Sequence, residues 1–189
     1  MIRRLIPALL LMATPCVAMA QDSDTETVPI TGTVARICVL GTPSQTNIDL
    51  GGLINVSGPR VGRLAVITPR SVNLPGSFCN FAGSALTVSA TALVAADASA
   101  LQTGFARAVN YTATTTGWTT PGTAAATAAT EAGASPTTAS TGATQPAPRL
   151  ADLTLTLASY AVPSDRLLVA GAYSGQVVIT LAPVASGEF

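Results

Sequence analysis

Histidine and lysine are both absent from this 189-residue sequence, so all nine of its basic residues are arginines. Without histidine, the chain cannot build a Ser-His-Asp or Cys-His catalytic unit, and it lacks the commonest metal ligand. Without lysine, it cannot use an S-x-x-K nucleophile. We therefore expect neither a metal ion nor a cofactor.

Charge of either sign is scarce. Charged residues make up 10% of the chain, against about 25% in an ordinary soluble domain. Proteins that bind nucleic acid concentrate lysine and arginine on one face, and no such cluster exists here, so nucleic acid is not an expected partner. The sequence predicts a non-enzyme, and isolated carboxylates acting as a glycosidase are the enzymatic alternative. These acids stand singly: Asp49, Asp97, Glu131, Asp152, Asp165 and Glu188.

The first twenty residues have the order of a secretory signal. Met1 to Arg4 is cationic, an apolar run follows, and Ala18-Met19-Ala20 supplies the small residues of a cleavage site. The run is too short for a membrane anchor, which needs about 20 apolar residues, and two prolines interrupt it. A lipoprotein attached through Cys16 is disfavoured by the proline before it. We expect residues 21–189 to be exported to the periplasm, the cell surface or the medium, with no membrane span.

Cleavage would leave two cysteines, Cys38 and Cys79. In an oxidising compartment two cysteines usually form one disulfide. Closing a loop of roughly 40 residues stabilises a fold by ~4 kcal/mol in the chain-entropy account. The sequence therefore predicts one disulfide, and two free thiols are the alternative.

Apolar and polar residues alternate along much of the chain, which is typical of half-buried strands. Glycine and proline clusters separate the alternating runs. Short strands with a single disulfide predict an all-β antiparallel, Ig-like sandwich in one domain. The predicted strands are Ser84–Val94, Leu150–Ala158 and Tyr173–Leu181, with shorter candidates at Val28–Val39, Asn47–Leu50, Val61–Ile67, Val72–Leu74 and Ala106–Ala113.

Residues 112–148 are almost entirely threonine, alanine, serine, glycine and proline. A segment without branched apolar or aromatic side chains buries too little surface to offset the entropy lost on ordering. We expect a long, exposed, flexible loop between two strands. Trp118 is its one large side chain, either pinned against the sandwich or exposed for contact with a sugar or a surface.

Three stretches carry a resemblance to a known family: Gly32-Thr33-Val34-Ala35-Arg36-Ile37-Cys38, Ser77-Phe78-Cys79-Asn80, and Leu168 to Leu181 with its alternating end. They resemble the pilin-like, fimbrial subunits of the chaperone–usher class, and the spore coat protein U-like branch is the nearest match. The resemblance covers the two ends of the exported domain.

The resemblance implies an Ig-like sandwich that lacks its last strand. A neighbouring subunit's N-terminal segment, or a strand of a periplasmic chaperone, would then fill the gap by pairing with an open sheet edge. It also implies that Cys38 and Cys79 tie the first strand to the second. The final strand would offer Tyr173, Val177, Ile179 and Leu181, the last three lining the groove, and the donated strand would insert Val28, Ile30 and Val34.

Two functions follow as expectations. One is an exported structural or adhesive surface protein, a pilin-like subunit that assembles by strand donation. The other is a self-contained secreted or periplasmic binding module without catalytic activity, with ligand contacts from loops such as 112–148. Pro29 keeps the second open, because proline cannot donate to a β ladder and is common in edge strands.

Overall fold

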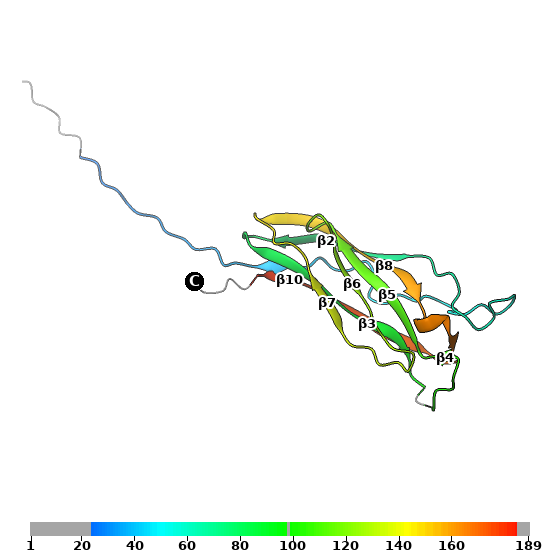
Figure 1. Ribbon diagram of the computed structural model, residues 1–189. Coiled ribbons are helices and arrows are strands. Elements are labelled where there is room, and N and C mark those ends of the chain that lie inside the picture. Colours follow the sequence, from blue (N-terminus) through cyan, green and yellow to red (C-terminus); the bar gives the residue numbers. More distant parts are fainter. Residues whose placement is uncertain (1–23, 98, 185–189) are drawn as a thin grey trace, which may run out of the picture. The chain divides into compact units, whose positions relative to one another are not determined.

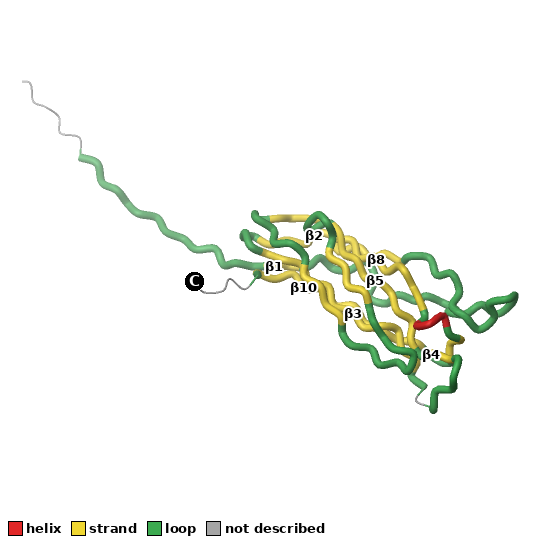
Figure 2. Tube along the Cα trace, in the orientation of Figure 1, coloured by secondary structure: helices red, strands yellow, loops and turns green. Residues whose placement is uncertain are grey.

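The computed structural model describes residues 24–97 and 99–184. Strands dominate this part of the chain, and its one helical element is a short 3-10 turn, η1 (Pro163–Asp165) (Figure 2). None of the described residues forms a helix long and apolar enough to cross a bilayer. Residues 24–34 form no helix or strand, and residues 35–184 form the sandwich. The predicted signal peptide, residues 1–20, lies outside the described residues.

The first layer of the sandwich is an antiparallel sheet. Its strands follow the order β1 (Cys38–Val39), β2 (Arg70–Cys79), β8 (Arg149–Ala161) and β5 (Ala108–Thr116), and β6 (Thr123–Ala126) extends the layer beyond β5 (Figure 1).

The second layer has β3 (Ser84–Ala95) at its centre. β10 (Tyr173–Pro183) pairs with it on one side and β7 (Thr138–Thr141) on the other, both antiparallel. β5 also pairs with the end of β3, which joins the two layers. A short parallel pair, β4 (Phe105–Ala106) with β9 (Leu167–Leu168), lies outside this sheet. The predicted all-β fold class is confirmed.

The core lies between the layers, where the alternation of the strands directs their apolar side chains. Leu153, Leu155 and Leu157 of β8 are buried together, while the threonines between them face outward and are partly exposed. The long alternating runs thus form β3, β8 and β10 within three residues of the predicted limits.

The two ends of the sandwich differ. At the disulfide end, β2 ends in Cys79 and β10 ends in Pro183. At the opposite end, residues 53–66 form an irregular hairpin, in which the Asn55 N–H donates to the Arg63 carbonyl at 3.0 Å. The Leu168 N–H donates to the Gly62 carbonyl at 3.0 Å and ties this hairpin to β9. We call this the hairpin end (Figure 1).

Three of the shorter predicted strands are wrong in extent. Of Val28–Val39 only Cys38–Val39 is a strand, and Asn47–Leu50 and Val61–Ile67 form none. Residues 61–65 belong to the returning arm of the hairpin, where only isolated bridges form. Alternation alone does not supply a neighbouring strand with which to pair.

The predicted exposed loop at 112–148 is also wrong. This segment contains the end of β5 and the strands β6 and β7 (Figure 1). Along β6 and just beyond it, buried and exposed residues alternate. Asn110 holds the segment that follows, because its Oδ1 accepts the Ala129 N–H at 2.7 Å. Small side chains let the backbone approach the core closely, so little branched apolar surface is needed. The buried members are Thr123, Ala125, Thr127 and Ala129.

Trp118 is buried, with 1% of its surface exposed. The Gln145 side chain donates to the Trp118 carbonyl at 2.9 Å and fixes the neighbouring backbone. Its place in the core confirms that it is pinned against the sandwich. The alternative, an exposed aromatic that contacts a sugar or a surface, is wrong.

Candidate functional site

The candidate site begins with the outer edge of β10. Among the described residues β10 pairs with β3 alone, so its other edge has no strand hydrogen-bonded to it. An Ig-type sandwich has the strand orders A-B-E-D and C-F-G. The order β1-β2-β8-β5 matches the first, and β3-β10 matches C-F. The edge without a neighbour is therefore the edge where strand G stands in a complete Ig-type sandwich.

A groove of about 800 Å³ runs along this edge, within the range of ~300–1,000 Å³ typical of ligand sites. One wall is residues 175–179 of β10, and the other is the segment 40–50. The floor is the exposed part of the sandwich core. Its apolar lining comprises Leu40, Ile48, Leu50, Val72, Leu74, Leu93, Leu155, Leu157, Val177 and Ile179.

Residues 41–50, here called the strap, lie along the edge of β2 without forming a ladder. The Ser44 N–H donates to the Asn73 carbonyl at 2.8 Å, and the Asn73 N–H donates to the Ser44 hydroxyl at 3.0 Å. The Gly41 N–H donates to the Ser77 hydroxyl at 2.9 Å. Ser44 thus satisfies both backbone groups of Asn73, with which another strand could otherwise pair.

Gly41 is required where the strap begins. A Cβ at this position would lie 1.8 Å from the Pro75 carbonyl oxygen, well inside any permitted contact. The chain can turn from β1 on to the edge of β2 only because this residue has no side chain.

Two tyrosines lie in the floor of the groove. The Tyr111 hydroxyl donates to the Thr91 carbonyl at 2.8 Å and is 3.3 Å from the Gln176 carbonyl oxygen, which links β5 to β3 and β10. Burial, with a smaller contribution from Tyr160, raises the pKa of Tyr111 to about 12. Burial also raises the pKa of Tyr160, and its buried hydroxyl has no partner among the described residues. Both hydroxyls are therefore neutral at physiological pH.

The four predicted groove residues lie in three different parts of the structure. Val177 and Ile179 line the groove and are only half-buried. Leu181 is buried in the core next to the disulfide end. Tyr173 lines a second, adjoining cavity of about 640 Å³ at the hairpin end, and its hydroxyl donates to the Val169 carbonyl at 2.8 Å. The sequence pattern identified the β10 wall, but not the strap that forms the opposite wall.

The predicted donor residues are exposed. Val28, Ile30 and Val34 are 78%, 95% and 88% exposed. In an extended chain residues separated by an even number share one face, so these three side chains and Gly32 would form one apolar row.

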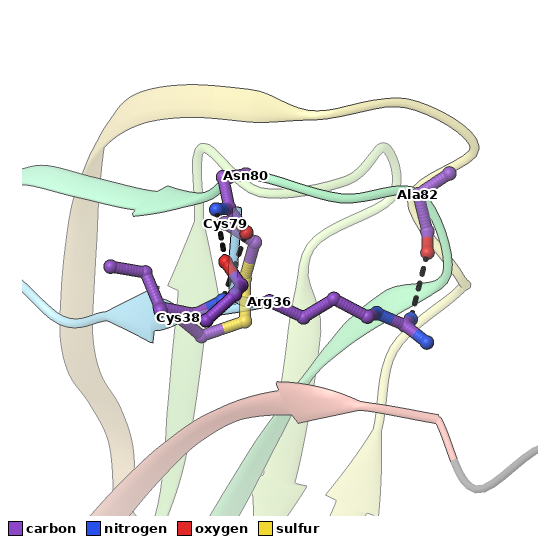
Figure 3. Close-up of a disulfide and its surroundings, with 7 residues drawn as sticks. Arg36, Cys38, Cys79, Asn80 and Ala82 are labelled. Atoms are coloured by element: carbon purple, nitrogen blue, oxygen red, sulfur yellow. Dashed lines mark hydrogen bonds between the residues drawn. A yellow bond between two sulfur atoms is a disulfide. The ribbon is translucent and has the colours of Figure 1, made fainter. Parts of the chain in front are cut away.

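The predicted disulfide between Cys38 and Cys79 is confirmed, and it joins β1 to β2 (Figure 3). Asn80 extends the same contact, because its side chain donates to the Ala35 carbonyl at 2.7 Å and accepts the Ile37 N–H at 2.8 Å. The guanidinium of Arg36 lies 4.2 Å from the centre of the Phe81 ring. The chain is therefore fixed to the sandwich from Ala35 onward.

The described carboxylates that could act as catalysts have structural partners instead. Asp165 binds Arg60 at 2.8 Å and Arg63 at 3.2 Å, which holds the pKa of its carboxyl below the usual 3.8. Glu131 pairs with Arg166 at 3.2 Å. Asp49 and Asp97 each accept the backbone N–H of the residue two positions on, Gly51 and Ser99. Asp152 of β8 accepts the N–H of Gly76 in the neighbouring strand β2. Glu188 lies outside the described residues.

No protein-family model matches the chain, and no curated protein or solved structure is significantly similar to it.

Proposed function

We propose that this chain is an exported structural subunit that assembles by strand donation, in which residues 28–34 of one copy pair with the outer edge of β10 in another. One observation carries the proposal: the sandwich has the A-B-E-D and C-F strand order, and its core is open where strand G would stand. A donated strand would bond the β10 backbone and cover the half-buried Val177 and Ile179.

The exposed row of the donor segment supports a second copy of this chain as the source of that strand. Val28, Ile30 and Val34 alternate with polar residues, as the groove requires of a strand that is buried on one face. Pro29 lacks an N–H but would accept through its carbonyl, and it can stand near the end of an edge strand. A periplasmic chaperone that holds the groove until assembly is part of the same proposal.

The test is a pair of matched variants in the exported chain. Ile30→Asp places a charge on the apolar row, whereas Thr31→Asp places the same charge on the opposite face of the segment. We expect the wild type and Thr31→Asp to form oligomers at micromolar concentration in sedimentation experiments. Ile30→Asp should remain monomeric. A wild type that is a stable monomer, or equal behaviour of the two variants, contradicts strand donation.

A self-contained binding module is the second candidate, and the groove itself favours it. Its volume suits a small ligand, and its floor is apolar apart from the two tyrosines. This function predicts a monomeric wild type whose melting temperature rises with an apolar ligand such as a fatty acid. An oligomer that excludes that ligand supports strand donation instead.

A further inference from the structure

The disulfide end of the sandwich carries an exposed apolar row on its outer face. Val39 pairs with Phe78, and Phe78 pairs with Leu150, so the three side chains lie side by side across β1, β2 and β8. Leu150 is 73% exposed and Val39 is 43% exposed. Most of the outer face of this sheet is instead threonine, serine and alanine. We call these three residues the apolar row.

The hairpin end carries a second exposed apolar surface. The hairpin directs Leu53 and Leu64 toward a small core cluster, where they are partly buried. Its other apolar side chains face outward, and Val56 is 84% exposed. Ile54 is 41% exposed, and it lines the second cavity, which adjoins the groove. The outward side chains are Ile54, Val56, Val61 and Val66.

We propose that the apolar row of one copy packs against the hairpin of the copy that accepts its donated strand. The proposal rests on the proposed function, and it names the two surfaces that strand donation would bring into contact. The strand neighbours within the two main layers are antiparallel, so a strand added beside β10 should also be antiparallel. Its last residue, Val34, would then lie at the hairpin end of the acceptor.

The segment that links the donated strand to its own sandwich is short. Ala35, the residue after Val34, is already held on its own sandwich by Asn80, and Cys38 is held by the disulfide. Three residues separate Val34 from Cys38, and an extended chain spans at most about 3.6 Å per residue. The disulfide end of the donor must therefore lie against the hairpin end of the acceptor. Each of these ends carries exposed apolar side chains, and contact between them would remove both from water.

The test uses charge substitutions in the exported chain. Leu150→Asp and Val56→Asp each place a charge on one of the two surfaces, and both side chains are exposed enough to leave the fold intact. Ala124→Asp is the control, because it adds the same charge to an exposed position of β6 outside both surfaces. We expect each test variant to weaken association by about tenfold in sedimentation experiments, and the control to stay within about twofold of wild type.

A double variant makes the contact itself measurable. Val56→Asp with Leu150→Arg places opposite charges on surfaces that meet between copies, so association should recover to within about threefold of wild type. Circular dichroism melting of each variant confirms that it is folded. If the wild type assembles and the single variants assemble equally well, or if the double variant assembles no better than Val56→Asp alone, this contact is wrong while strand donation stands. A monomeric wild type contradicts both.

Discussion

On one side of the sandwich β6 and β7 lie beside each other and close the space between the layers, whereas on the other side only the strap lies along β2. The closed side buries Trp118 and small residues of β6, with backbone bonds from the Asn110 and Gln145 side chains. On the open side Val177 and Ile179 remain half-buried, and β10 has no hydrogen-bonded neighbour other than β3 among the described residues. On the closed side β6 is paired with β5 and β7 with β3, whereas in the described part of the chain no strand is paired with the outer edge of β10.

The largest effect is expected when one side chain of the closed side is compared with one of the open side. Trp118→Ala should lower the free energy of unfolding by about 4 kcal/mol, because it opens a cavity in a closed part of the core. Val177→Ala should lower it by only about 1 kcal/mol, since Val177 already faces the groove. Urea denaturation of the two variants measures both values. Equal losses would mean that the groove side is as well packed as the other.

The disulfide joins β1, the strand that precedes the strap, to β2. Cys38→Ser and Cys79→Ser should each lower the free energy of unfolding by about 3 kcal/mol. The two losses should agree, and the double variant should lose no more than either one, because a single bond is removed in every case. Urea titrations under non-reducing conditions, with the disulfide-bonded wild type as the reference, give the comparison. Clearly additive losses would show that the two sulfurs stabilise the fold independently.

The strap depends on the absence of a side chain at position 41. Gly41→Ala should cost about 2 kcal/mol, as overpacking does, because the new Cβ meets the Pro75 carbonyl. Gly52→Ala is the matched control, since a Cβ there has nothing within 4 Å. Thermal melting compares the two, and faster exchange of the β2 amides in Gly41→Ala would show that its edge has opened. Equal melting temperatures of the two variants would contradict the close approach of the strap to β2 at position 41.

The smallest expected effect is a pH dependence at the hairpin end. The pKa of Asp165 is lowered in the fold by its bond to Arg60, so the pair contributes above the usual pKa of 3.8 and is lost as pH falls through the folded value. We expect the Leu168 amide, which donates to Gly62, to exchange faster as the pH falls below 3.8, after correction for the intrinsic rate. Asp165→Asn should remove this dependence. An unchanged pH dependence in that variant would assign it to another group.

Sequence alone predicted β3, β8 and β10, in which large and polar residues alternate over nine or more positions, but the predicted strand Val28–Val39 is a strand only at Cys38–Val39. It missed β6 and β7, because threonine and alanine by themselves indicate neither a buried face nor a turn. Only in the folded chain do Asn110 and Trp118 lie beside this segment. The disulfide followed from the number of cysteines and the expected compartment. Of the groove, the alternation found Val177 and Ile179 in β10. The strap wall depends on contacts of Gly41 and Ser44 with a strand some thirty residues away, which no local pattern records.

Hydrogen exchange along β10 tests the central claim most directly. The sample is the Ile30→Asp chain, whose groove should be empty, with and without a synthetic peptide of residues 24–36. We expect the peptide to slow exchange of the β10 amides that do not donate to β3 by at least about tenfold while β7 amides stay unchanged, and a peptide carrying Ile30→Asp to have no effect. If saturating peptide leaves the exchange of these outward amides unchanged, or if they are already protected without it, this edge does not accept a strand.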